Sequence, residues 1–260
     1  MIGAISGDII GSIYEWNNIK TTEFPVLSDG MFFTDDTVLT IATADCILNK
    51  KDFADTYRRY CIKYPGRGYG GSFIGWAESG DSSPYNSWGN GSAMRVSPIG
   101  FAFNDLDTVL EIAKKSAEVT HNHPEGIKGA ESVAAAVFLA RQGKSREEIK
   151  DYIEKEFRYD LSESIESIRN WYSFDVSCQG SVPQAIRAFY ESVSFEDAIK
   201  KAVSIGGDSD TIACITGGIA EAFYKIIPEN IRTAVFNIID NDMRKIISDF
   251  YHYYLPEINI

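Results

Sequence analysis

The chain has 260 residues, of which 44% are hydrophobic, 13% aromatic and 24% charged, and its formal net charge is −12 at pH 7. This length is enough to bury a substantial core, and the composition is that of a globular protein rather than a disordered one. The negative charge, with no run of Lys or Arg, argues against an extended nucleic-acid-binding surface.

The N-terminal stretch "MIGAISGDIIGSIYEW" is apolar, but it lacks the basic region of a secretion signal and carries Asp8 and Glu15. No stretch approaches the length of about 18 uncharged apolar residues that a membrane-spanning helix needs. The four cysteines have no C-x-x-C spacing and are expected to be buried free thiols. We therefore expect a soluble, cytoplasmic protein without membrane contact.

Helical periodicity dominates the chain, and no segment shows the alternating pattern of a β-strand. The segment 145–157 carries one apolar stripe and starts with capping-box spacing between Ser145 and Glu148. Ser194 is the expected cap of a later helix, and Pro183 is expected in the first turn of another. Further helices are predicted at 35–49, 52–63, 106–118, 126–142, 228–239 and 241–254.

A central helix is predicted after the glycine pair at 206–207, because the residues that follow are apolar almost all round. The segment 64–97 is rich in Gly, Ser, Asn and aromatic residues and is predicted to be the longest irregular part of the chain. A loop of this length in a compact domain is more often functional than idle. No linker is apparent, so we predict an all-α fold in one domain spanning residues 1–260.

Two short acidic motifs, "FTDDT" at 33–37 and "GGDSDT" at 206–211, point to a metal site. Adjacent side chains on a regular helix diverge by about 100°, so neighbouring acids converge only at a helix start, where Thr34 would be the N-cap. Two such starts facing each other would present four carboxylates and two hydroxyls. Hard oxygen ligands suit Mg²⁺ or Mn²⁺, and two divalent ions would balance four carboxylate charges.

Other interpretations of the two motifs exist. Taken singly, each is more typical of a helix cap with acids in its first turn, whereas their matching composition favours a shared metal centre. "DSDT" also resembles, superficially, the D-x-D-x-T signature of haloacid dehalogenase-type phosphohydrolases. That signature follows a β-strand and places its threonine two positions after the second aspartate. Here Thr211 follows Asp210 directly, and a helix is expected before the motif.

The chain resembles the ADP-ribosylglycohydrolase family in ordered segments that span most of its length: "GDIIGSIYE" (7–15), "FTDDT" (33–37), "WGNGSAMR" (88–95), "THNHPEGIKGA" (120–130) and "GGDSDTIA" (206–213). The resemblance implies an all-α domain with a binuclear centre of two Mg²⁺ per chain, with Mn²⁺ as an alternative metal. It also implies the metal ligands, which are Thr34, Asp35, Asp36, Asp208, Asp210 and Thr211.

The same resemblance implies catalytic and substrate-binding residues. Glu15 is similar to the glutamate that some family members place over the metal centre, and Asp36 and Asp208 complete the expected catalytic set. Backbone N–H groups of a glycine-rich segment approach phosphate closely, which suits the expected diphosphate site. The residues implied to contact the diphosphate and the distal ribose are Ser87, Trp88, Gly89, Asn90, Gly91 and His121.

The function that the resemblance implies is hydrolysis of the glycosidic bond between ADP-ribose and a protein side chain or small conjugate. The leaving group stays open among ADP-ribosyl-serine, ADP-ribosyl-arginine, O-acetyl-ADP-ribose and a modified nucleobase. "GSIYE" is more similar to the branch that acts on O-linked substrates. The alternative is a family member that binds ADP-ribose without cleaving it.

Overall fold

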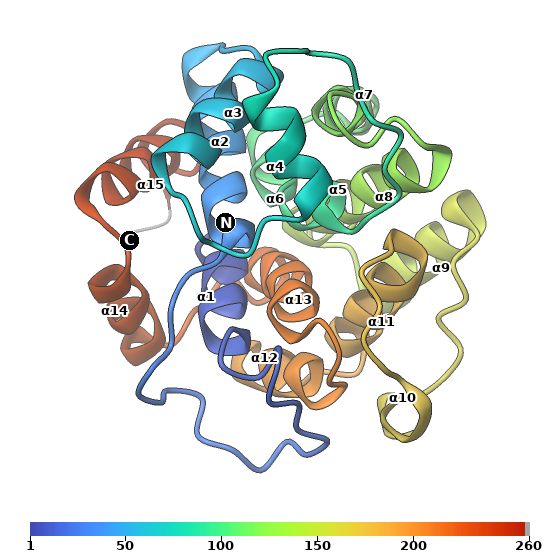
Figure 1. Cartoon of the computed structure of the whole chain (residues 1–260). Helices are drawn as coiled ribbons and strands as arrows, with labels where there is room; N and C mark the ends of the chain where they lie inside the picture. The colour runs from blue at the N-terminus through green and yellow to red at the C-terminus, as the bar shows by residue number, and fades with distance from the viewer. Residues whose placement is uncertain (258–260) are drawn as a thin grey trace.

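The computed structural model describes residues 1–257, and in this part of the chain the regular structure is α-helical without a β-strand. The predicted all-α fold is therefore confirmed (Figure 1). The helices are α1 (Ile2–Gly11), α2 (Asp35–Asn49), α3 (Phe53–Lys63), α4 (Gly71–Glu78), α5 (Gly91–Met94), α6 (Ser97–Ala102), α7 (Leu106–Glu118), α8 (Pro124–Arg141), α9 (Arg146–Phe157), α10 (Ile165–Trp171), α11 (Cys178–Tyr190), α12 (Phe195–Ser204), α13 (Ser209–Tyr224), α14 (Glu229–Ile238) and α15 (Asn241–Tyr254).

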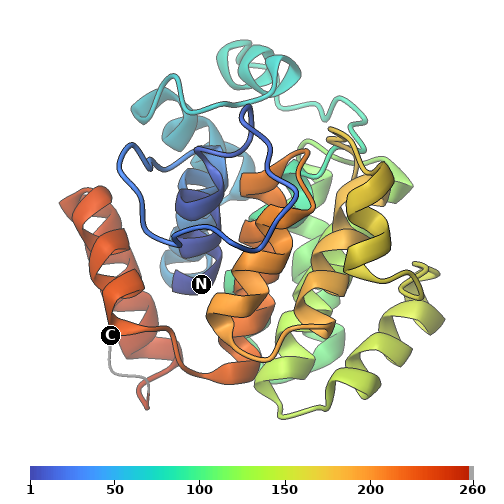
Figure 2. The same ribbon diagram turned by 90° about the horizontal axis from the view of Figure 1, so that it is seen from below.

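Helices α1 and α13 pack against each other at the centre of the molecule. Figures 1 and 2 show this pair with α14 and α15 on one side and α8 to α11 on the other. All of α1 is buried, and so is α13 from its start to Ala222. The predicted central helix after the glycine pair is thus confirmed.

Glycines spaced four residues apart let the two central helices approach closely. A Cβ atom added at Gly7 would lie 1.9 Å from the carbonyl oxygen of Ala213, and one at Gly3 would lie 2.3 Å from that of Gly217. Only glycine fits at such backbone contacts. Because Asp8 follows Gly7 and Asp210 lies near Gly11, this packing also brings the two acids toward each other.

Most helix boundaries follow the predicted caps. The helix predicted at 35–49 begins at Asp35 with Thr34 as N-cap, and the capping box of Ser145 and Glu148 is present at the start of α9. Ser194 caps α12 as predicted. These signals are local, since each cap bonds to a backbone N–H two or three residues further along the chain.

Two predictions about local structure were wrong. Segment 64–97 is not irregular throughout, because it contains α4 and α5. Two aromatic side chains of α4, Phe73 and Trp76, are buried, so tertiary packing overrides the poor helix propensity of its glycines. Helix α11 starts at Cys178, and Pro183 lies inside it rather than in its first turn. That first turn is held by Ser177, whose side chain accepts from the N–H of Gly180.

Within residues 1–257, no helix combines the length and the apolar composition needed to cross a membrane.

Candidate active site

The start of α2 presents the first acidic motif. Thr34 is the N-cap, and its hydroxyl oxygen lies 3.3 Å from the N–H of Asp36 and 3.2 Å from the Oδ2 atom of Asp36. The backbone N–H of Asp35 donates to the carbonyl of Arg67 over 2.7 Å, which anchors the helix start to the segment before α4. Asp36 is buried and points inward, as expected for a site residue at a helix start.

The start of α13 presents the second motif after a sharp turn. Gly206 and Gly207 have φ values of 75° and 72°, which lie in the left-handed region that favours glycine. Asp208 is the N-cap, yet its side chain makes no bond to the backbone of its own helix. Its Oδ2 atom instead accepts from the Nδ2 atom of Asn90 over 2.6 Å.

The two helix starts face each other, and their acids converge. The hydroxyl of Thr211 donates to the Oδ2 atom of Asp36 over 3.1 Å, which links α13 directly to α2. Two groups of three carboxylates have ligand atoms within 4.8 Å of one another, and both groups contain Asp210. Neither group contains Asp35, although this residue lines the same cavity. The groups are Asp8, Asp36, Asp210 and Glu15, Asp208, Asp210.

Asp8 is a site residue that the sequence analysis did not assign. Its Oδ2 atom accepts from the backbone N–H groups of Thr34 and Thr37, both over 3.0 Å, and its Oδ1 atom accepts from the Thr34 hydroxyl over 2.7 Å. This carboxylate therefore holds the first turn of α2 against α1. One sequence signal could have identified Asp8. A charged residue inside an otherwise largely apolar helix with regularly spaced glycines needs a buried partner.

Burial raises the pKa values of the acids, and the negative charges of neighbouring acids raise them further. Burial, followed by the charges of Asp8, Asp35 and Asp208, raises the pKa of Asp36 well above its usual range. Burial, followed by the charges of Asp208 and Asp36, does the same to the pKa of Asp210. Burial and the charge of Asp208 raise the pKa of Glu15 to about 7. The cluster is thus electrostatically unfavourable by itself and would be relieved by cations.

The donor set fits divalent metal ions. The Oδ1 atom of Asp36 is buried and has no hydrogen-bond partner within the described part of the chain. A buried carboxylate oxygen without a partner is costly unless an ion or water satisfies it. The converging groups offer only oxygen atoms, and no thiolate or imidazole joins them. Such a set suits Mg²⁺ or Mn²⁺ better than zinc.

The acid cluster lies at one wall of a cavity of about 400 Å³. Most residues predicted to bind substrate line this cavity, namely Ser87, Gly89, Asn90, Gly91 and His121, and so does Glu15, which was predicted to be catalytic. Trp88 is not among the lining residues, and its half-exposed ring lies 5.4 Å from that of His123. Gly89 and Ser177 form a short antiparallel bridge, which holds this segment against the start of α11.

His121 and Arg95 form a buried polar pair at the cavity wall. The Nδ1 atom of His121 lies 2.8 Å from the hydroxyl of Thr120, and the same hydroxyl accepts from the Nη2 atom of Arg95 over 3.0 Å. Burial and the charge of Arg95 lower the pKa of His121 well below its usual range, which keeps the imidazole neutral. Arg95 also stacks on the ring of Tyr57, with 4.2 Å between its guanidinium carbon and the ring centroid.

Aromatic side chains not predicted from the sequence border the cavity. The rings of Trp16 and Phe174 stack with centroids 5.2 Å apart and an interplanar angle of 23°. Both are well exposed, and Val176 beside them is 54% exposed. Trp16 directly follows Glu15, and Phe174 and Val176 lie after α10, in segments that have no periodic pattern in the sequence.

A model of the ADP-ribosylglycohydrolase family matches residues 1–257. The chain belongs to this family. The similarity predicted from the motifs is thereby confirmed, and the protein is a hydrolase of this family.

Known relatives agree with the family assignment. The human ADP-ribosylhydrolase ARH3 is 26% identical over 88% of this chain and 86% of its own length. The ADP-ribosylarginine hydrolase Tri1 of Pseudomonas putida is 26% identical, over 59% of this chain and 42% of its own length. A solved structure described as an ADP-ribosylglycohydrolase-related protein complex matches with a TM-score of 0.76 and 22% identity, covering 98% of this chain and 96% of that one. The last match shows a shared fold.

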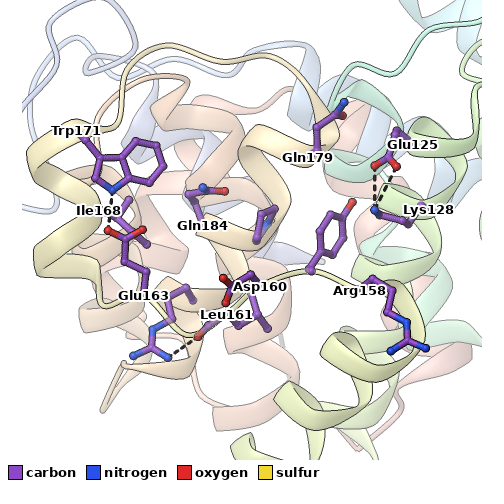
Figure 3. Close-up of a pocket in the computed structure, with 13 residues that line it drawn as sticks. Glu125, Lys128, Arg158, Asp160, Leu161, Glu163, Ile168, Trp171, Gln179 and Gln184 are labelled. Atoms are coloured by element: carbon purple, nitrogen blue, oxygen red, sulfur yellow. Dashed lines mark hydrogen bonds and ion pairs between the residues drawn. The ribbon is translucent and has the colours of Figure 1, made fainter.

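This ADP-ribosylglycohydrolase has a second cavity, of about 480 Å³, between α8, α10, α11 and the segment that joins α9 to α10 (Figure 3). Some of its polar groups are paired within its own wall, and Arg187 pairs with Glu191 outside it. Lys128 lies 3.0 Å from Glu125, and the indole N–H of Trp171 donates to Glu163 over 2.7 Å. No group of converging carboxylates lies there among the described residues. The smaller, acid-lined cavity is therefore the candidate active site.

Proposed function

We propose that this protein is a divalent-metal-dependent hydrolase that cleaves the glycosidic bond between ADP-ribose and a protein side chain or small conjugate. The observation that carries the proposal is the pair of carboxylate groups joined by Asp210 at the wall of the candidate cavity. Two adjacent groups of oxygen ligands suit two hard ions, Mg²⁺ or Mn²⁺, better than one. The names of the relatives support ADP-ribose as the substrate group.

The ions would be held where the two helix starts meet. When bound, they supply Lewis-acid catalysis at this position. Asp210 would contribute to both positions, because it belongs to both carboxylate groups. Asp8 would orient the start of α2, since both of its oxygens already accept hydrogen bonds there. The proposed metal-binding residues are Thr34, Asp35, Asp36, Asp208, Asp210 and Thr211.

The part of the cavity lined by residues 87–91 suits the diphosphate, and the distal ribose, whose glycosidic bond is cleaved, would lie beside the acids. Ser87, Gly89 and Gly91 line this part of the cavity without large side chains, so the backbone can approach phosphate oxygens closely. The N–H groups of Ser87 and Gly89 already bond to the carbonyl of Thr120 and the hydroxyl of Ser87, whereas that of Gly91 lies in the first turn of α5, where an N–H has no partner within its own helix. Arg95 is a cation among the lining residues, and its Nε and Nη1 atoms have no hydrogen-bond partner in the described chain. An anionic substrate would be attracted by this buried positive charge.

Glu15 is the proposed proton donor or acceptor. It lines the cavity, and its carboxylate belongs to the group with Asp208 and Asp210. Its pKa, raised to about 7, suits proton exchange near neutral pH. It would donate a proton to the leaving atom or accept one from the attacking water as the sugar passes through an oxocarbenium-like state.

The decisive experiment measures release of ADP-ribose from defined conjugates. The panel contains an ADP-ribosyl-serine peptide, an ADP-ribosyl-arginine peptide, O-acetyl-ADP-ribose and an ADP-ribosylated nucleobase. We expect release from at least one conjugate, loss of release with chelator, and recovery with Mg²⁺ or Mn²⁺. Tight binding of ADP-ribose without release from any conjugate would show a binding protein instead.

Substitution of Glu15 by glutamine separates proton transfer from substrate binding. Glutamine keeps the size of the side chain but does not exchange a proton at neutral pH. We expect Glu15→Gln to lower turnover by roughly 10²–10⁴-fold, the usual contribution of a general acid or base. The affinity for ADP-ribose, measured by calorimetry, should change by no more than a few-fold. Lost affinity with normal turnover at saturation would identify Glu15 as a binding residue.

A further inference from the structure

The segment that carries Glu15 is tied to the turn before α13 by one amide side chain. The Oδ1 atom of Asn18 accepts from the N–H of Gly207 over 2.6 Å, and its Nδ2 atom lies 3.1 Å from the carbonyl of Gly207. The same Nδ2 atom lies 2.7 Å from the carbonyl of Glu15. Asn18 therefore bonds both to the residue before Asp208 and to the backbone of Glu15.

A lysine two residues further along the chain adds a second tie. The Nζ atom of Lys20 donates to the carbonyl of Tyr172 over 2.7 Å and to that of Ile205 over 2.5 Å. No carboxylate lies within ion-pair distance of this ammonium among residues 1–257. Ile205 is the C-cap of α12, where carbonyl groups carry the negative end of the helix dipole. The ammonium group of Lys20 therefore bonds to backbone carbonyl groups rather than to a carboxylate.

The geometry of the glycine turn explains why these ties are needed. Both glycines are in the left-handed region, and Asn18 bonds to both the N–H and the C=O of Gly207, whose carbonyl also lies 3.3 Å from the hydroxyl of Ser209. Added side chains would not fit here. A Cβ atom on Gly206 would lie 3.1 Å from the Nζ atom of Lys20, and one on Gly207 would lie 2.6 Å from the ring of Tyr172. The two glycines therefore leave space for the segment that follows Glu15 and for Tyr172.

We infer that Asn18 and Lys20 are positioning residues that fix the carboxylate of Glu15 against Asp208 and Asp210. This inference rests on the proposed function, because it assigns a purpose to the position of Glu15. Asn18 lies three residues after Glu15, and its partner Gly207 directly precedes Asp208, so the bonded pair sets the spacing between the two acids. Misplacement of a catalytic group by about 1 Å can cost on the order of 10²-fold in rate.

The neighbouring residue Asn17 provides a matched control. It has the same side chain in the same segment, but its Nδ2 atom lies 3.4 Å from the carbonyl of Ile13, and within residues 1–257 it makes no bond to another part of the chain. Asn17 is exposed. If the segment only needed an amide side chain for solubility or local turn formation, the two asparagines would behave alike.

The test compares Asn18→Ala, Lys20→Met and Asn17→Ala with the unchanged protein, using the conjugate that the panel identifies as substrate. For Asn18→Ala we expect kcat to fall on the order of 10²-fold, with KM and ADP-ribose affinity changed by no more than a few-fold. Lys20→Met, which loosens the segment at a second point, should lower kcat in the same direction. Asn17→Ala should retain normal kcat.

A double substitution shows whether the effect passes through Glu15. If Asn18 acts only by positioning Glu15, Asn18→Ala should have little further effect in the Glu15→Gln background. An equal loss in both backgrounds, or a loss of Mg²⁺ affinity that accounts for the lower kcat, would overturn the inference and show general support of the fold. Normal kcat in both Asn18→Ala and Lys20→Met would also overturn it.

The same experiment distinguishes failure of the inference from failure of the proposed function. Normal turnover by Glu15→Gln would overturn the proton-transfer role, and with it the role of the residues that position Glu15. A large loss in Glu15→Gln together with full activity of Asn18→Ala and Lys20→Met would overturn only the positioning inference.

Discussion

The two helix starts at the candidate site have similar sequences but are held in place differently. At α2, Thr34 caps its own helix, and Asp8 from the central helix α1 binds the backbone of the first turn. At α13, Asp208 makes no cap bond, and it is held from outside by Asn90. One start is thus fixed by the core and the other by a segment that also lines the cavity.

The two helix starts should therefore respond differently to substitutions. The α2 start depends on Asp8, a buried carboxylate behind the cavity wall and next to Asp36, so its disturbance should affect metal binding and stability together. The α13 start is bound to the segment at 87–91, so its disturbance should affect metal binding and substrate binding together. Substitutions at each helix start test this difference.

The largest effect is expected from removal of the converging acids. The double substitution Asp36→Ala and Asp208→Ala removes one acid from each carboxylate group and leaves Asp210 with only Asp8 and Glu15. We expect metal binding to fall below detection by calorimetry and release of ADP-ribose to cease. Asp160→Ala, which removes an exposed acid at the second cavity, should change neither. Full binding of two ions by the double variant would show that the two helix starts do not share a metal centre.

Sequence analysis predicted the parts of the fold that depend on local signals. The starts of α2, α9 and α12 follow from caps whose bonds stay within a few residues. Helix α4 was missed because its glycine-rich sequence becomes helical through aromatic packing. The early start of α11 was missed because Pro183 suggested a helix start, whereas Ser177 provides one upstream.

The candidate site shows the same distinction between local sequence signals and contacts that are distant in sequence. The motifs identified the acids at both helix starts, since carboxylates so close together need a common partner. Asp8 and Asn18 were not assigned, because each acts on residues far away in sequence, at Thr34 and Gly207. Trp88 was assigned with its neighbours, but it is not among the residues that line the cavity. Roles that depend on distant contacts are not encoded in a local pattern.

Asp8→Asn should produce the next largest effect. Asparagine has nearly the same shape, but it carries no charge and presents an N–H group toward donors of Thr34 and Thr37. Loss of an outer-shell partner typically costs about 10–100-fold in metal affinity or activity. The unsatisfied backbone donors should also lower the free energy of unfolding by about 1–3 kcal/mol. Calorimetry with Mg²⁺ and denaturant unfolding measure the two effects.

Asp45→Asn is the matched control for Asp8. Asp45 is also a buried acid, but it lies toward the other end of α2 and is paired with Lys51 and Arg59. This variant should lose stability without losing Mg²⁺ affinity. If Asp8→Asn and Asp45→Asn behave alike, Asp8 serves the fold and has no special relation to the metal centre.

Asn90→Ala should have a smaller effect of a different kind. It leaves the Oδ2 atom of Asp208 without its amide donor and removes a side chain from the cavity wall. We expect a loss of about 10-fold in Mg²⁺ affinity, at the lower end for such partners, together with a raised KM for the conjugate. Ser181→Ala, which removes the other partner of the Asn90 amide, should change KM less. If Asn90→Ala changed the stability of the protein but neither Mg²⁺ affinity nor KM, the proposed difference between the starts of α2 and α13 would be wrong.

The smallest expected effect is a pH dependence of the stabilisation by metal. Burial and neighbouring charge raise the pKa of Glu15 to about 7, and burial raises that of Asp8 to about 6. The folded protein then holds more protons than the unfolded chain between the ordinary and the raised pKa values. The resulting stabilisation is present at low pH and is lost as the pH rises through about 6 to 7.

Melting temperatures with Mg²⁺ and with chelator, measured from pH 5 to pH 8, test this expectation. The chelated protein should lose stability relative to the Mg²⁺ form as the pH rises, because the acids ionise beside one another without a counter-ion. At 100 times its dissociation constant a ligand adds about 2.7 kcal/mol, which corresponds to roughly 5–10 °C for a protein near this size. Exposed acids titrate equally in the Mg²⁺ form and in the chelated form, so they do not contribute to the difference between the two melting temperatures. A difference that stays constant across this range would mean that the acids are not close enough to raise one another's pKa values, and the convergence of the two helix starts would be wrong.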